Sequence, residues 1–136
     1  MKVKDLDFNE YNINLNGYIV KAQEYRPRSQ YHINARELLK DIFPTVHILE
    51  EVPVRLRTNS NAFIDFFVNQ FKIVVEVHGQ QHYKFNAMFH NSLQDFIKQK
   101  KRDSDLIEWC AINNLTYIEL KYDESIEEWK KKINTR

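Results

Sequence analysis

The stretch that decides the fold is 63–83, with the sequence FIDFFVNQFKIVVEVHGQQHY. Two runs rich in β-branched and aromatic residues, FIDFFV and KIVVEVHG, flank a short polar segment, which is the pattern of a β-hairpin. Apolar residues from Phe63 to Val68 occupy both faces of the first run, so we expect this strand to be buried on both sides. Asp65 lies in its middle, where a buried carboxylate is costly unless it is paired, protonated or bound to a cation.

The second run places Glu76 and His78 on one face, because alternate residues of a strand share a face. A tight turn at residues 70–71 would bring Asp65 opposite Glu76, with His78 as a diagonal neighbour. His82 follows three residues after the glycine that ends the strand. Four ionisable side chains are therefore expected to converge at one end of an apolar hairpin.

The rest of the chain alternates between helical and extended patterns. We expect a helix from the N-cap Ser29 to about Phe43, strands at 47–54 and 116–122, a loop at 82–91, a long helix over 92–113 and a last helix capped by Asp123. This order, helix, three strands, helix, strand, helix, predicts an α/β fold with a mixed β-sheet flanked by helices. Residues 1–28 are interpreted as an N-terminal arm or extra strand, with a possible strand near residues 18–22, and residues 29–136 as the main domain.

Both longer helices carry a polar residue on the face expected to be buried. In the first helix His32 lies inside the apolar stripe, whereas Glu37 points the opposite way, to solvent. In the long helix Asp103 shares the expected inner face, which is formed by Leu93, Phe96, Ile97, Ile107, Cys110 and Ala111. His32 and Asp103 thus join the set of polar groups directed at the core.

Composition limits the class of protein. The chain has 136 residues, a net charge of +1 and one cysteine, which indicate a single domain without an internal disulfide. Its charged start and the lack of a long apolar run argue against a signal peptide or membrane span, so we expect no membrane partner and a cytoplasmic location. Because the net charge is small, any nucleic-acid surface must be local. The candidate basic residues are Arg26, Arg28, Lys84, Lys98, Lys100, Lys101 and Arg102.

The polar residues directed at the core are His32, Asp65, Glu76, His78, His82 and Asp103. Each taken alone has an ordinary explanation in an ion pair or a backbone hydrogen bond. Together they favour metal-assisted phosphodiester hydrolysis, in which carboxylates hold Mg²⁺ and a histidine transfers a proton. The alternative metal centre is a zinc site formed by His78, His82, His90 and Cys110.

At these residues the sequence resembles a known superfamily. IDFFV followed by IVVEVHGQQH is similar to the core of the restriction-endonuclease-like, PD-(D/E)XK, superfamily. The branch that it resembles contains the very short patch repair endonucleases, the EDxHD homing endonucleases and small proteins with an ExDGxxH motif. The resemblance covers roughly residues 29–122 and implies a single-domain restriction-endonuclease-like sandwich.

The resemblance also implies roles for particular residues. Asp65 would be the main metal ligand, the carbonyl of Val77 a second ligand, and Glu76 the glutamate of the ExDGxxH branch. His82 would be the preferred general base, with His78 contacting the phosphate or leaving group. Asp103 would be the acid of the helix that closes the site, and His32 stands where the family has a glutamate. The lysine of the usual motif is replaced by His78, and the zinc-binding cysteines of the repair enzymes are missing.

The sequence therefore predicts an Mg²⁺-dependent DNA endonuclease, with Mn²⁺ as a possible substitute, acting on double-stranded DNA as a monomer or homodimer. Homing-type, mobile-element and phage-encoded nicking enzymes are the biological settings that it favours. The basic residues are expected to contact backbone phosphates, and Tyr83 and Phe85 to wedge or stack on a base step. Two alternatives stay open: a nucleic-acid-binding protein that has lost hydrolysis, and a protein-interaction module in which the polar residues form a buried network.

Overall fold

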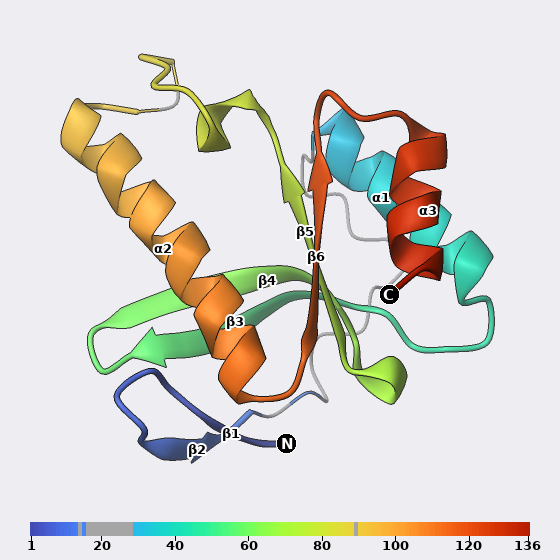
Figure 1. Cartoon of the computed structure of the whole chain (residues 1–136), viewed down its shortest axis with the longest axis horizontal. Helices are drawn as coiled ribbons and strands as arrows, with labels where there is room; N and C mark the ends of the chain where they lie inside the picture. Colours follow the sequence, from blue (N-terminus) through green and yellow to red (C-terminus); the bar gives the residue numbers. More distant parts are fainter. Residues whose placement is uncertain (14, 16–28, 89) are drawn as a thin grey trace.

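The computed structural model of the protein describes residues 1–13, 15, 29–88 and 90–136 (Figure 1). In chain order the strands and helices are β1 (Lys2–Lys4), β2 (Glu10–Asn12), α1 (Gln30–Ile42), β3 (Leu49–Arg57), β4 (Ser60–Val68), β5 (Ile73–His78), α2 (Leu93–Ile112), β6 (Thr116–Lys121) and α3 (Ile126–Asn134). Single 3₁₀ turns, η1 (Asn69–Phe71) and η2 (Gln80–His82), flank β5.

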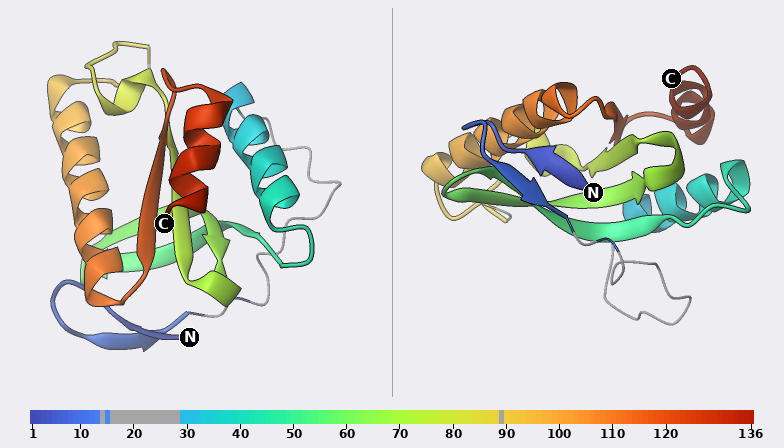
Figure 2. Two further views of the ribbon diagram at one scale, coloured as in Figure 1. Left: turned by 45° about the vertical axis from the view of Figure 1, so that its right-hand side comes forward. Right: turned by 90° about the horizontal axis from the view of Figure 1, so that it is seen from below.

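The main sheet has four strands in the order β3-β4-β5-β6. β3, β4 and β5 are antiparallel neighbours, whereas β5 and β6 run parallel and are joined through α2. Figures 1 and 2 show α2 on one side of β5 and β6, with α1 and α3 together on the other. The predicted α/β class with a mixed sheet and flanking helices is therefore confirmed.

Two apolar clusters hold the layers together. One joins the sheet to α2 through Leu106, Trp109 and Cys110 and also includes Val3 and Ile13 from the N-terminal region. The other joins the sheet to α1 and α3; its helical members are Ala35, Leu38, Leu39, Trp129 and Ile133. The sheet is thus packed on both faces, and the N-terminal part of α2 extends past the end of β5 (Figure 1).

The helix starts follow the predicted capping in two of three cases. Ser29 Oγ accepts the backbone N–H of His32, and Ser92 Oγ accepts that of Asp95. These bonds satisfy N–H groups that have no partner inside a helix. The third prediction was wrong, because α3 is capped by Ser125, two residues after Asp123.

The inner face predicted for α2 was largely wrong. Leu93 and Ile97 are 59% and 57% exposed, and Ile107 is also exposed. The buried stripe instead runs through Leu106, Trp109 and Cys110. Trp109 and Cys110 follow Leu106 by three and four residues, so all three lie on one face of the helix. Asp103 lies three residues before Leu106 and still faces inward, so that part of the prediction is confirmed.

The hairpin has the predicted register. Phe66 pairs with Val75, and continuing the ladder by one pair places Asp65 opposite Glu76. The turn is made by η1 and by Lys72, whose φ of 56° is in the left-handed region. One expectation for this hairpin fails: Phe63 is 67% exposed, because the face of β4 that carries it opens into a cleft that no other element fills.

The N-terminal residues form a feature that the sequence does not predict. β1 and β2 pair as a small antiparallel sheet, and the buried Asp5 beside them accepts a hydrogen bond of 3.0 Å from Arg55 Nε on β3. The possible strand near residues 18–22 lies outside the described residues. Among the helices that the structure describes, none combines the length and apolar character needed to cross a lipid bilayer.

Candidate active site

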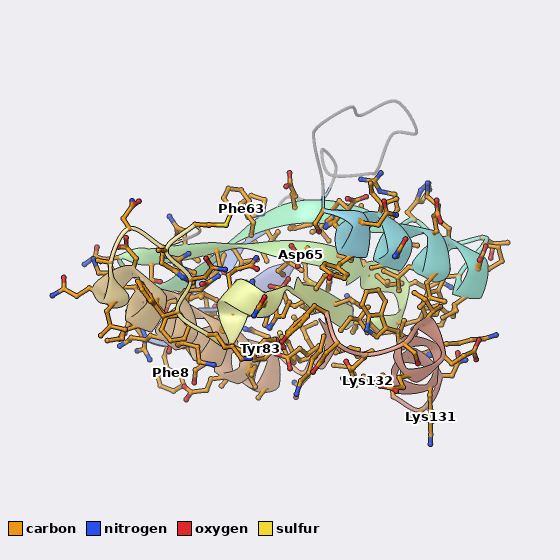
Figure 3. All side chains as sticks on the ribbon, turned by 90° about the horizontal axis from the view of Figure 1, so that it is seen from above. Phe8, Phe63, Asp65, Tyr83, Lys131 and Lys132 are labelled. Carbon is orange, nitrogen blue, oxygen red and sulfur yellow. The ribbon has the colours of Figure 1, made fainter. Side chains whose placement is uncertain are left out.

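The sequence-predicted polar residues meet in a cleft of about 590 Å³ that opens to solvent between β4, β5, η2 and α2 (Figure 3). Ten of its lining residues are polar and belong to these elements or to the turn after β5: Asn61, Asp65, Glu76, His78, Gln81, His82, Gln99, Arg102, Asp103 and, from the start of α1, His32. All six candidate catalytic residues therefore line one cavity, as the sequence predicts.

The half-buried Asp65 and the buried Glu76 form a carboxylate pair across β4 and β5. The backbone N–H of Asp65 donates to Glu76 Oε2 at 3.0 Å, and the N–H of Val77 donates to Asp65 Oδ2 at 2.8 Å. Burial, together with the adjacent negative charge of Asp65, raises the pKa of Glu76 well above its ordinary value. Two ionised carboxylates in this position repel each other, so the pair is suited to a cation and costly without one.

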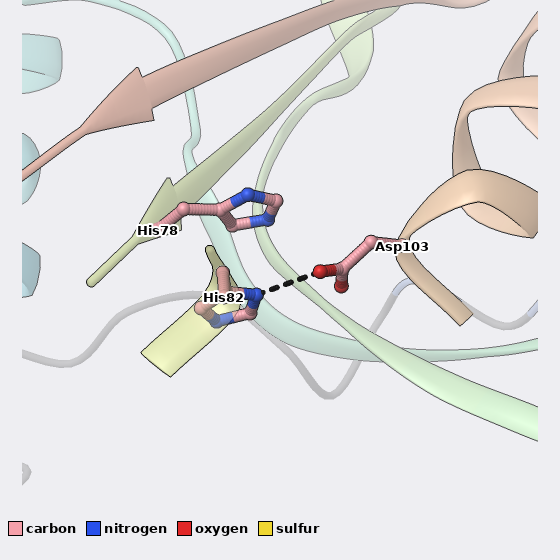
Figure 4. A group of neighbouring side chains, drawn as sticks. All are labelled: His78, His82 and Asp103. Carbon is pink, nitrogen blue, oxygen red and sulfur yellow. Dashed lines mark hydrogen bonds and ion pairs between the residues drawn. The ribbon is translucent and has the colours of Figure 1, made fainter. Parts of the chain in front are cut away.

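His82 and Asp103 form a second polar pair on the α2 side of the cleft (Figure 4). Asp103 Oδ2 lies 2.9 Å from His82 Nδ1. With Asp103 ionised, Nδ1 carries the proton that this bond requires, which leaves the lone pair on Nε2. His82 is thereby placed in the tautomer that can accept a proton from a molecule in the cleft.

Gln99 and His90 extend this pair along α2. His90 Nδ1 lies 3.0 Å from the backbone nitrogen of Asn86 and 3.1 Å from its carbonyl oxygen, and His90 Nε2 lies 2.7 Å from Gln99 Oε1. The amide nitrogen of Gln99 lies 3.5 Å from His82 Nδ1 and 3.4 Å from His82 Nε2. Gln99 thus lies between the two histidines.

His78 has its own acidic partner. Its Nδ1 lies 2.7 Å from Glu119 Oε1 on β6, and its ring stacks on that of His82 with centroids 4.0 Å apart (Figure 4). The hydrogen bond from His78 lowers the pKa of Glu119 although burial opposes it. Sequence reasoning missed Glu119. Its only signal was an acidic residue at alternate spacing in the TYIEL strand.

His32 is paired rather than free. Its Nε2 bonds to Glu50 on β3, and its ring stacks on Phe66 with centroids 4.5 Å apart. Arg36 donates to the same carboxylate from Nε at 2.7 Å and from Nη2 at 2.9 Å. Burial raises the pKa of Glu50, but the bonds from His32 and Arg36 outweigh it and lower the pKa to about 2. Glu37 is exposed, as expected, so His32 is the residue of α1 that reaches the cleft.

Ligand atoms of His78, His82 and Asp103 lie within 4.8 Å of one another, close enough for a transition metal after small side-chain movements. A cation there would have to displace the hydrogen bond between His82 and Asp103. The four-residue zinc site was wrong, because in the described part of the chain neither His90 nor Cys110 joins this group. Cys110 is in the apolar core, where burial raises the pKa of its thiol to about 12.

Five of the predicted basic residues are described by the structure, and two are not. Lys84, Lys98, Lys100, Lys101 and Arg102 are exposed, and Arg102 also lines the cleft. Lys100 Nζ lies 5.5 Å from the centre of the Tyr83 ring. Arg26 and Arg28 lie outside the described residues.

The aromatic residues predicted to wedge DNA are engaged in packing. Tyr83 is half-buried and lies against His78 and Tyr122. Phe85 is exposed on one side but stacks on the His90 ring. Neither ring projects freely into the cleft.

Comparisons with known proteins add relatives but no function. No protein-family model matches the chain, and no solved structure matches it significantly. "Uncharacterized protein 307L" of Invertebrate iridescent virus 6 is 41% identical over 64 residues, which are 47% of this chain and 32% of that protein. "Uncharacterized protein 033L" of Invertebrate iridescent virus 3 is 32% identical over 97 residues, 69% of this chain and 50% of that protein. The chain thus spans only a third to a half of the length of these relatives.

Proposed function

We propose that the protein is a divalent-metal-dependent DNA endonuclease whose active site is this cleft. One observation carries the proposal: a carboxylate pair, the half-buried Asp65 and the buried Glu76, shares one open cavity with a histidine that is hydrogen-bonded to Asp103. Phosphodiester hydrolysis needs a cation on the phosphate and a base for the attacking water, and the cleft offers a place for each.

Asp65 and Glu76 would hold the metal, with the carbonyl of Val77 as a further ligand. Their oxygen atoms suit Mg²⁺, which prefers carboxylate and carbonyl ligands and keeps several waters, and Mn²⁺ can replace it. When bound, the ion polarises the phosphate and acidifies a coordinated water. The high pKa of Glu76 in the metal-free protein supports this position, since a cation would favour the ionised form.

His82 would act as the general base. Its Nε2 lone pair accepts the proton of the attacking water, and Asp103 stabilises the imidazolium that forms. His78, held by Glu119, lies behind the His82 ring and fixes its plane by stacking. Arg102 and the neighbouring lysines of α2 supply positive charge for the DNA backbone on the same side.

The arrangement of the fold supports the same proposal. A helix, three antiparallel strands, a crossover helix and a parallel fourth strand, α1-β3-β4-β5-α2-β6, follow the order expected of a restriction-endonuclease-like core. By the resemblance, Asp65 on β4 would be the main metal ligand and Glu76 on β5 the glutamate of the ExDGxxH branch. Because the described residues form one such cleft, a monomer would nick one strand, and double-strand cleavage would need a homodimer.

Relaxation of supercoiled plasmid in Mg²⁺ or Mn²⁺ tests the proposal. Asp65→Asn should abolish nicking, and His82→Gln should slow it by about 10²- to 10⁴-fold, the usual contribution of a general base. His47→Gln is the matched control, because His47 is exposed and does not line the cleft. Nicking that persists in both cleft variants would refute the assignment.

A nucleic-acid-binding protein without hydrolysis is the second candidate. It is favoured by His78, which stands in the lysine position of the resembled motif and is engaged by Glu119. DNA binding by the wild type with no cleavage of supercoiled, linear, mismatched or single-stranded DNA in either metal would select this function.

A further inference from the structure

Phe63 is the most unusual apolar residue near the cleft. It lies inside strand β4, where the sequence predicts burial, yet 67% of its surface is exposed. It shares the cleft-lining face of β4 with Asn61 and Asp65, because residues two apart on a strand point the same way. Figure 3 labels Phe63 and Asp65 on this strand.

A single exposed aromatic residue is common and often has no function. Phe8, which is 72% exposed, is an example, since it occupies the turn between β1 and β2 and does not line the cleft. Phe63 differs in position. It lines the cleft two residues before Asp65, in a cavity whose other lining groups are mostly polar, and folding gains little from leaving an exposed ring there.

We propose that Phe63 is a stacking platform for an unpaired nucleobase of the substrate strand. This inference rests on the proposed function, since it assigns the substrate of the same cleft: DNA with unpaired bases next to the phosphate that is cleaved. Two residues of a β-strand span about 7 Å, close to the reach between a phosphate and the base of its own or the next nucleotide. A phosphate bound through a cation at Asp65 would therefore place a base within reach of the Phe63 ring.

An unpaired base fits this position better than a paired one. In a duplex each base is covered on both faces by its neighbours, and a ring can stack on it only after a base step has been opened, at a cost of a few kcal/mol. Phe63 projects from a strand within a concave surface, not from a protruding loop, so it is poorly placed to open a duplex. A base that is already unstacked can turn onto the ring without that cost.

The test is DNA binding measured by fluorescence anisotropy in Ca²⁺, a hard cation that carboxylates bind, with gel analysis to check that the DNA stays intact. The ligands are a labelled single strand, a duplex with an unpaired bubble and the fully paired duplex. Phe63→Ala should weaken binding to the first two by about 5- to 100-fold, the usual effect of losing one base-stacking contact, and change duplex binding less than 2-fold. Phe63→Trp should restore binding, and Phe8→Ala is the control for loss of an exposed ring elsewhere.

Three outcomes would overturn the inference: an equal loss on paired and unpaired DNA, no loss on any ligand, or no recovery with tryptophan. Replacing single nucleotides of the strand by abasic ones should identify one position at which Phe63→Ala has no further effect. Failure of the proposed function is a different result. DNA binding by the wild type that does not depend on Phe63 refutes only the stacking platform, whereas absence of DNA binding by the wild type refutes the nucleic-acid substrate itself.

Discussion

The pairing of His32 and Arg36 with Glu50 leads to a quantitative prediction about stability. Glu50→Gln preserves the size of the side chain but removes the charge that both partners bind. Arg36 and His32 then meet a neutral acceptor in place of a charged one, in a buried position where the loss of one member of an ion pair is costly. The variant should therefore lose stability at neutral pH.

The size of the loss follows from the pKa of Glu50. Folding lowers this pKa from 4.5 to about 2. Since one pKa unit corresponds to about 1.4 kcal/mol, the ion pair contributes about 3 kcal/mol at neutral pH. Because the pKa is lowered on folding, this stabilisation is complete above pH 4.5 and is lost as the pH falls toward 2. For a domain of this size, about 3 kcal/mol corresponds to a fall of about 10 °C in Tm.

Urea unfolding of the wild type and Glu50→Gln between pH 2.5 and 7.5 measures the difference directly. The free energies of unfolding should differ by about 3 kcal/mol at pH 7, and the difference should shrink to about 1 kcal/mol near pH 2.5. Glu37→Gln is the control, because Glu37 is an exposed residue of the same helix and its replacement should change stability by less than about 0.5 kcal/mol. A difference for Glu50→Gln below about 1 kcal/mol at pH 7, or one that is independent of pH, would refute the ion-pair reasoning.

Three further predictions concern the cleft. Glu76→Gln should stabilise the metal-free protein, because carboxylates about 5 Å apart repel by about 3 kcal/mol at an effective dielectric constant of about 20. Since the pKa of Glu76 is raised on folding, the gain in unfolding free energy should be present at pH 8 and vanish at acidic pH. Urea titrations in EDTA measure it. Glu119→Gln should have the opposite sign, a loss of about 1–2 kcal/mol at pH 7 that shrinks in acid, because the bond from His78 lowers the pKa of Glu119. Zn²⁺ should inhibit Mg²⁺-dependent nicking in plasmid assays, because a Zn²⁺ ion bound by His78, His82 and Asp103 would occupy the imidazole that serves as the general base. Activity that is unaffected by excess Zn²⁺ would count against that cluster as a metal site.

The sequence predicts the backbone of the site better than its hydrogen bonds. The period of two in IVVEVH correctly places Glu76 and His78 on one face, and the hairpin register correctly places Asp65 opposite Glu76. These predictions succeed because alternation and strand pairing are local rules. The same rules fail for Phe63, since whether a strand face is covered depends on elements far away in the sequence.

The acidic partners of the histidines could not be predicted for a similar reason. Glu50 is 18 residues from His32, and Asp103 is 21 residues from His82. Glu119 meets His78 only because β5 and β6 pair in parallel, with His78 beside Lys121. No periodicity within one element carries this information.

The three pairs also define the orientation of the cleft histidines. The lone pair of a neutral imidazole has a fixed position only if the other ring nitrogen is held by a hydrogen bond. Each cleft histidine is held by a carboxylate from a different element: β3 for His32, β6 for His78 and α2 for His82. The site is therefore assembled only when α1, the sheet and α2 are packed together. It follows that a core substitution that loosens one layer should disrupt the histidine–carboxylate pairs and the tertiary fold in the same unfolding transition.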